Sequence, residues 1–187
     1  MFDKFIPNEY ERLENAPRYP ELIGTSAAFG CSITFGIGVE IGEDWPGLLG
    51  LYNAGQPGSS NDRIARRVSE YVSEYSPERI YVMWTYPGRR EWLSEDGTYM
   101  RFNSTSKHHT GTDWHNSFVM LSNERADKYN YYKNKKFVEA LCHSNGIELC
   151  QCDINLVDAD LYERGTDGHH PGKKWHEEVA NRIKYGL

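Results

Sequence analysis

The sequence predicts a three-layer α/β/α sandwich around a mostly parallel sheet of flavodoxin-like type. Two observations favour this fold: short apolar runs alternate with stretches of helical periodicity, and no internal repeat interrupts the succession. Strands that alternate with helices form right-handed βαβ units, which cover both faces of a parallel sheet. The chain has 187 residues and no Gly/Ser-rich linker, so we expect one domain over residues 1–187.

Four short apolar segments are the expected strands. The segment 24–31 is small and apolar and leads into a glycine-rich stretch, and 51–53 is followed by a Gly- and Pro-containing turn. Segment 79–84 is a continuous run of apolar, β-branched and aromatic residues, and 147–152 follows a glycine. Runs this short favour buried strands over buried helices.

Three segments carry helical periodicity. The strongest begins at Ser60, with Ser59 and Asp62 as a start of the capping-box kind, and the others lie at 126–144 and 173–184. Residues 1–22 are expected to be a surface lead-in. Residues 86–125 lack sustained periodicity, so we expect a long excursion there that can contain a hairpin.

Composition excludes several classes of function. The net charge is -6 without a dense Lys/Arg cluster, which argues against nucleic acid as a partner. The charged, proline-interrupted N-terminal stretch has neither the apolar core of a signal peptide nor a membrane-spanning run, so a cytoplasmic protein without membrane association is expected. Four cysteines are too sparse for a disulfide framework and are expected to be reduced thiols.

Two loops carry residues suited to nucleophilic catalysis. Ser32 directly follows the first expected strand, at the edge where open parallel sheets bind ligands. Asp167 and His170 stand before the last helix. A serine hydroxyl becomes an effective nucleophile when a histidine accepts its proton and a carboxylate orients that histidine. Taken alone, each feature is more typical of a turn or a helix cap.

In combination, three segments resemble the conserved blocks of SGNH/GDSL hydrolases: GCSITFG at 30–36, YNAGQPGSSNDRI at 52–64 and DGHHPGKKWHEEVANRI at 167–183. The resemblance implies the SGNH hydrolase fold and a serine esterase or deacylase that needs no cofactor. It implies Ser32 as nucleophile, His170 as general base and then acid, and Asp167 as the orienting carboxylate. The backbone amides of Ser32 and Gly55 would face the oxyanion. The implied substrate is a small O-acyl ester, with an acetylated carbohydrate as one candidate.

The third block departs from the family pattern. After the third strand the family usually places Gly-x-Asn-Asp, whose asparagine donates to the oxyanion, whereas this chain has WTYPGR at 84–89. Thr85, Tyr86 and Arg89 are candidates to replace that donor or to hold substrate. A solvated ion-pair cluster at 89–91 is an equal alternative. Because one oxyanion donor is worth about two to three orders of magnitude in rate, a weakened or inactive binding or assembly protein is the competing hypothesis.

Other polar residues are assigned no catalytic role. The spacing of His108, His109, Asp113 and His115 matches no metal-binding motif, so a polar surface loop and no metal are expected. Cys31 is expected to be a small buried thiol. His169 and His176 are expected outside the catalytic pair. The sequence leaves the oligomeric state open.

Overall fold

The computed structural model describes residues 18–93, 95, 97, 99–103, 116–117 and 120–186. Its centre is a four-stranded sheet in the order β2-β1-β3-β6, in which every pairing is parallel. The strands are β1 (Ala27–Phe29), β2 (Tyr52–Asn53), β3 (Arg79–Trp84) and β6 (Glu148–Asp153). They lie in the four expected segments, and the predicted α/β fold class is confirmed.

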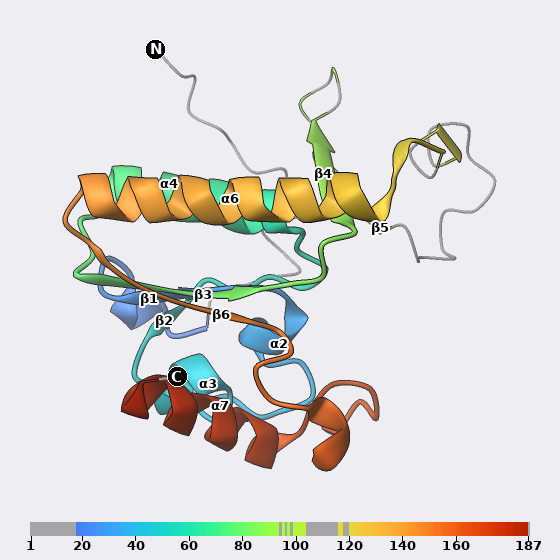
Figure 1. Cartoon of the computed structure of the whole chain (residues 1–187). Helices are drawn as coiled ribbons and strands as arrows, with labels where there is room; N and C mark the ends of the chain where they lie inside the picture. Colours follow the sequence, from blue (N-terminus) through green and yellow to red (C-terminus); the bar gives the residue numbers. More distant parts are fainter. Residues whose placement is uncertain are drawn as a thin grey trace.

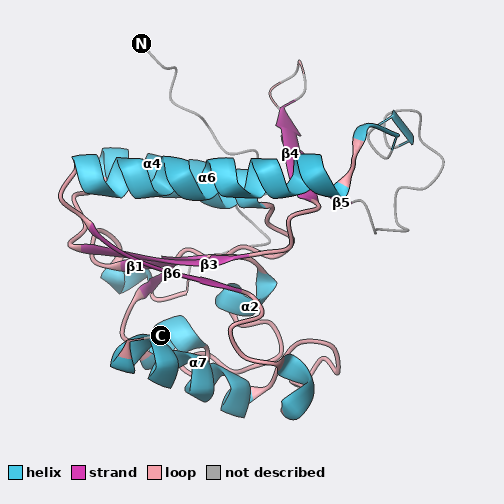
Figure 2. Ribbon diagram, in the orientation of Figure 1, coloured by secondary structure: helices cyan, strands magenta, loops and turns pink. Residues whose placement is uncertain are grey.

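Helices cover both faces of this sheet (Figure 1). One face carries α4 (Asn61–Glu74) and α6 (Glu124–Ser144), and the other carries α3 (Trp45–Leu48) and α7 (Lys173–Tyr185). Three further elements are short helical turns: α2 (Ser32–Phe35), η1 (Pro20–Leu22) and η3 (Ala159–Leu161). In Figure 2 the sheet lies between the two helical layers, with α2 at one end of the strands.

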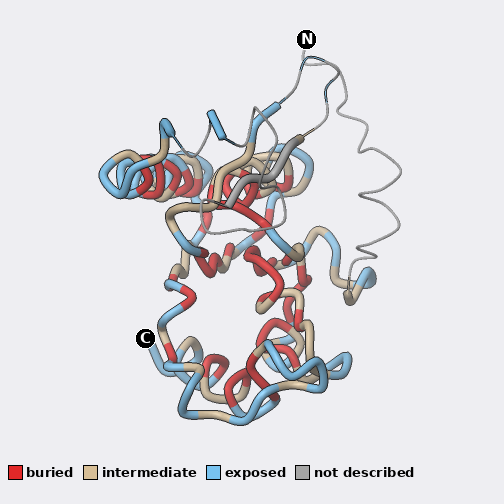
Figure 3. Tube along the Cα trace, turned by 90° about the vertical axis from the view of Figure 1, so that its right-hand side faces the viewer, coloured by how far each residue is buried: buried red, intermediate tan, exposed pale blue. Residues whose placement is uncertain are grey.

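The alternation of side chains along the strands divides the core into two halves. Phe29 and Val82 pack with Ile64 and Val68 of α4, whereas Ala28 and Met83 pack on the opposite face with Trp175 of α7 and its neighbours. Figure 3 shows the buried residues gathered in the sheet and on the helix sides that face it. Both faces are therefore apolar, as a parallel sheet between two helical layers requires.

The start of α4 differs from the expected one by a residue. Ser60, rather than Ser59, is the N-cap, and its hydroxyl accepts from the Arg63 N–H at 3.1 Å. The Ser59 hydroxyl instead donates to the Gln56 carbonyl at 2.8 Å. Asp62 does not complete a capping box, because its carboxylate accepts from Asn130 and Asn134 of α6 and from the Glu91 N–H. It joins the two helices of this layer.

The stretch after β3 contains an antiparallel hairpin, β4 (Arg89–Leu93) with β5 (Tyr99–Asn103). Two of its charged residues form ion pairs with the helices of the adjacent layer. Arg90 pairs with Asp127 of α6 at 3.0 Å, and Glu91 pairs with Arg66 of α4 at 3.0 Å. The ion-pair interpretation of this cluster is therefore correct for Arg90 and Glu91. No helix in the described part of the chain is long and apolar enough to cross a membrane, and the four cysteines form no disulfide.

His176 is a fully buried histidine that links α7 to α3. Its Nδ1 accepts the Trp45 N–H at 3.2 Å, so the proton of the neutral ring lies on Nε2. Burial lowers the pKa of His176 from 6.5 to about 4. The unfolded chain therefore binds more protons than the folded chain between these two values, and stability is lost as the pH falls through them.

We expect the free energy of unfolding to fall by about 2 kcal/mol between about pH 7 and pH 5 because of this histidine alone. His176→Gln removes the titratable ring and should remove that part of the pH dependence, measured by urea unfolding at both pH values. The solvent-exposed His143→Gln serves as the matched control. Equal pH dependence in the parent and in His176→Gln would contradict this role.

Candidate active site

Ser32 lies where the chain turns from β1 into α2. It is the first residue of that helix, 9% exposed, at the carboxyl edge of the sheet. Gly30 makes the sharp turn possible, because a Cβ at this position would overlap the Thr34 side chain, 2.7 Å from its Cβ. Gly36 ends the helix at φ 90°, a conformation that favours glycine. The two glycines therefore confine Ser32 to one short helical turn.

Asp167 and His170 lie in the loop that precedes α7. Asp167 Oδ1 accepts the backbone N–H groups of His169 at 3.1 Å and His170 at 3.0 Å, and Gly168 between them has φ 70°. This is a side-chain-closed turn, which asparagine and aspartate favour. The turn directs the His170 ring back across the carboxylate.

The three side chains form one hydrogen-bonded chain. His170 Nε2 lies 3.0 Å from Ser32 Oγ, and His170 Nδ1 lies 2.5 Å from Asp167 Oδ2. The hydrogen bond from His170, assisted by the backbone N–H groups of the turn, holds the pKa of the Asp167 carboxyl far below its usual value. An ionised carboxylate accepts the Nδ1 proton, so the Nε2 lone pair faces the serine hydroxyl. The arrangement suits proton transfer from Ser32.

Backbone contacts bring together these two loops, which are about 130 residues apart in sequence. The Gly38 carbonyl accepts the Thr166 N–H at 2.8 Å. Close approach is possible because Gly38 and Gly165 face each other, and a Cβ at Gly165 would lie 2.8 Å from Gly38 Cα. The loop after α2 is thereby docked on the loop that carries Asp167, which fixes the register between the serine and the histidine.

A buried polar network holds α2 in place from beneath. Asn53, at the end of β2, donates from Nδ2 to the Thr34 carbonyl at 2.8 Å and to Asp44 Oδ1 at 3.0 Å. The fully buried Asp44 carboxylate also accepts from Arg18 at 2.9 Å, Tyr19 at 2.7 Å and the Gly47 N–H at 3.0 Å. The roles of Asn53 and Asp44 could not be predicted from the sequence, because contacts between distant residues produce no pattern in the local sequence around either of them.

The expectation for Gly55 needs correction. Its N–H does not face an open space but donates to Asn53 Oδ1 at 2.9 Å. A Cβ at Gly55 would lie 2.5 Å from the Phe35 nitrogen, so this glycine allows the second loop to pack on the backbone of α2. The Gly58 N–H, three residues further on, has no acceptor among the described residues, and neither has the Ser32 N–H. Gly58 has φ 70°, a conformation that glycine adopts readily, in a Pro-Gly turn.

The third loop, after β3, places one hydroxyl in a buried position. Phe29 of β1 pairs with Val82 of β3, and Ser32 and Thr85 each follow three residues later. The Asn61 side chain fixes the Thr85 backbone, accepting its N–H at 2.9 Å and donating to its carbonyl at 3.1 Å. Thr85 is 2% exposed, and its Oγ1 has no hydrogen-bond partner in the described part of the chain.

Tyr86 and Arg89 occupy different surroundings from Thr85. Tyr86 is half exposed, and the Arg89 guanidinium lies 5.4 Å from the centre of its ring. One buried Arg89 nitrogen, Nη1, has no partner among the described residues. A desolvated guanidinium with an unused donor is suited to an anionic or carbonyl oxygen.

The remaining candidates are set apart from this chain of hydrogen bonds. Cys31 is buried, and His176 bonds to Trp45 instead. The residues His108, His109, Asp113 and His115 lie outside the described residues. Over the part of the chain that is described, no group of three or more His, Cys, Asp or Glu side chains is arranged to hold a metal ion.

No family model and no curated protein sequence matches the chain. Solved structures of similar fold include a family 3 carbohydrate esterase from Clostridium thermocellum, with 15% identity and TM-score 0.42 over 86% of this chain and 92% of that one. The esterase EstA from Pseudoalteromonas sp. has 15% identity and TM-score 0.41, over 87% and 94%. A GDSL-like lipase from Bacteroides thetaiotaomicron has 16% identity and TM-score 0.39, over 96% and 98%.

Asn53→Leu should lower the free energy of unfolding by about 2–3 kcal/mol, because it leaves the Gly55 N–H and the Thr34 carbonyl without their side-chain partner and removes one donor from the buried Asp44 carboxylate. Urea unfolding monitored by circular dichroism measures this loss. Asn155→Leu, at an exposed position, makes the same chemical change and should stay within about 0.5 kcal/mol of the parent. A similar result for both variants would show that the network does not hold α2.

Proposed function

We propose that this protein is a serine hydrolase that cleaves small O-acyl esters through an acyl-Ser32 intermediate. The observation that carries the proposal is the continuous chain from Ser32 Oγ through both nitrogens of His170 to the Asp167 carboxylate. Such a chain supplies the three roles of nucleophile, proton acceptor and orienting anion. The small exposed fraction of Ser32 suits a short acyl group, and an acetylated carbohydrate is one candidate among such esters.

The first half-reaction acylates the serine. Ser32 Oγ attacks the ester carbonyl carbon while its proton passes to His170 Nε2, and the negative charge of Asp167 stabilises the resulting imidazolium. The tetrahedral intermediate collapses as the bond to the leaving alcohol breaks. His170 gives its proton to the leaving oxygen. The products of this step are the free alcohol and acyl-Ser32.

The second half-reaction uses water in place of the alcohol. His170 takes one proton from the attacking water, and the second tetrahedral intermediate collapses to release the carboxylic acid. The proton returns from His170 to Ser32 Oγ, which restores the starting state. In both halves the carbonyl oxygen gains negative charge and needs hydrogen-bond donors. We assign this role to the Ser32 N–H group, with the Thr85 hydroxyl as a second donor.

Ser32→Ala and His170→Ala should each remove about four to six orders of magnitude of kcat on p-nitrophenyl acetate, and the double variant should be no slower than either. The losses do not add because the two residues act as one unit. His169→Ala is the control, because it changes the neighbouring ring and retains the backbone N–H that Asp167 accepts. A fluorophosphonate probe should label Ser32 in the parent. Parent activity in Ser32→Ala would exclude Ser32 as the nucleophile, whereas a parent protein that neither hydrolyses the ester nor reacts with the probe would favour a binding protein.

Replacing the third-loop donors should separate transition-state stabilisation from substrate binding. Thr85→Val keeps the shape of a buried side chain and should lower kcat by about two to three orders of magnitude with KM unchanged. Arg89→Met should mainly raise KM. Tyr86→Phe, at a half-exposed ring, is the control. If all three variants retain parent kinetics, the loop supplies no side-chain donor to the oxyanion.

A further inference from the structure

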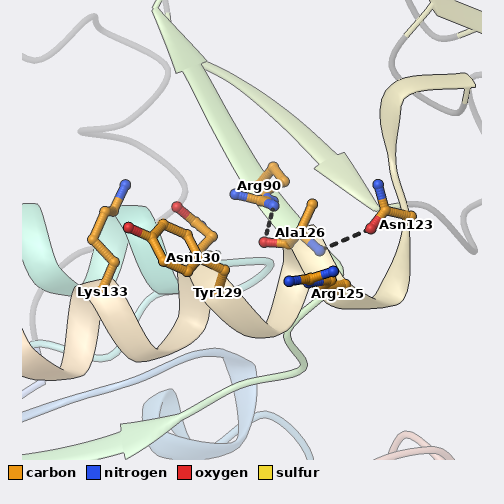
Figure 4. A pocket seen from close by; sticks show the side chains of 7 residues that line it. All are labelled: Arg90, Asn123, Arg125, Ala126, Tyr129, Asn130 and Lys133. Atoms are coloured by element: carbon orange, nitrogen blue, oxygen red, sulfur yellow. Dashed lines mark hydrogen bonds between the residues drawn. The ribbon is translucent and has the colours of Figure 1, made fainter.

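A hollow of about 580 Å³ lies between strand β4 of the hairpin and the first half of α6 (Figure 4). It is lined by Arg90, Asn123, Arg125, Ala126, Tyr129, Asn130 and Lys133. Every charged side chain among these residues is a cation. On a protein whose net charge is -6, such a concentration of positive charge sets this surface apart.

Two of the three cations that line this hollow have no acidic partner among the described residues. Neither Arg125 nor Lys133 forms an ion pair or a side-chain hydrogen bond with another described residue. Other cations on the same helix are paired: Lys128 lies 2.6 Å from Glu124, and Lys136 lies 2.5 Å from Glu139. The two unpaired cations are therefore the ones that line the hollow, which favours an anionic ligand.

Arg90 is held in position within the hollow. Its Nε and Nη2 donate to Asp127 Oδ1 at 3.2 and 3.0 Å, and Nη2 also donates to the Ala126 carbonyl at 2.9 Å. These bonds leave Nη1 without a partner among the described residues. Asp127 neutralises much of the Arg90 charge, so Arg90 offers an oriented donor while Arg125 and Lys133 supply the net charge.

The uncharged part of the lining adds an aromatic ring and two side-chain amides, each of which forms one hydrogen bond within the protein. Tyr129 is 74% exposed, so one ring face is open to a ligand. Asn123 uses its Oδ1 to cap Ala126 N, and Asn130 uses its Nδ2 on Asp62, which leaves one amide donor and one amide acceptor. Figure 4 shows these side chains on neighbouring turns of α6, with Arg90 reaching them from β4. The lining can therefore bind a ligand that has hydroxyl groups for the amides, a ring for Tyr129 and an anionic group for the cations.

We propose that this hollow binds a carboxylate-bearing sugar residue, such as a uronic acid of an oligosaccharide. Its volume is that of a site for a small organic ligand and exceeds what a lone inorganic anion fills. The ring of Tyr129 offers a stacking surface for a pyranose. The hairpin that carries Arg90 follows β3 at the carboxyl edge of the central sheet, which is also the edge at which Ser32 follows β1. The binding proposal stands whether or not Ser32 is a catalyst.

Isothermal titration with trigalacturonate at low salt tests the proposal, using the Ser32→Ala protein so that no hydrolysis interferes. We expect saturable binding that weakens at least about tenfold when the carboxylates are methyl-esterified. The Arg125→Gln/Lys133→Gln double variant should weaken binding by a similar factor. Lys128→Gln/Lys136→Gln removes two paired charges from the same helix and should change binding less than about twofold. Tyr129→Leu should weaken both the acidic and the esterified ligand.

Three results would overturn the proposal. Absence of binding up to about 20 mM ligand would remove the sugar site. Equal weakening by the two double variants would reduce the effect to general charge attraction. Tighter binding of inorganic phosphate or adenosine monophosphate than of trigalacturonate would assign the hollow to phosphate esters. Because titration reads binding and the fluorophosphonate probe reads Ser32, failure of one proposal is distinguishable from failure of the other.

Discussion

The buried Asp44 carboxylate is the constraint on which the site depends. A charge removed from water must be satisfied by donors, and Asp44 draws them from three separate segments: Arg18 and Tyr19, Gly47, and Asn53. Asn53 then passes the constraint on to the Thr34 carbonyl of α2. The helix turn that presents Ser32 is therefore fixed to β2 and to the segment before η1 by polar bonds rather than by apolar packing alone.

Above this network the site is assembled from opposite ends of the chain. Ser32 follows the first strand, and His170 precedes the last helix, so a parallel sheet with α7 packed on α3 brings them together. Glycines determine how closely the loops approach: Gly30 turns the chain into α2, Gly55 touches its backbone, and Gly38 meets Gly165. A side chain at any of these positions would separate the elements that carry the three groups.

Two groups of polar residues lie in different layers of the fold. The Ser32 hydroxyl, the His170 imidazole and the Asp167 carboxylate lie where β1 and the loop before α7 meet, while the cations of the hairpin and α6 lie in the other helical layer. Asp62 and Asp127 anchor that second region by bonding to Asn130, Asn134 and Arg90. The sheet thus gives each region its own rigid support, and a substitution in one need not disturb the other.

The sequence by itself determined the alternation of strands and helices, because short apolar runs and helical periodicity are local patterns. It also singled out Ser32, Asp167 and His170, but only in combination, because each feature taken alone is more typical of a turn or a helix cap. The tertiary structure alone decided the partner of the Gly55 N–H, the burial of Asp44 and the unpartnered hydroxyl of Thr85. Hydrogen bonds between segments tens of residues apart depend on packing geometry, and no pattern within either segment encodes them.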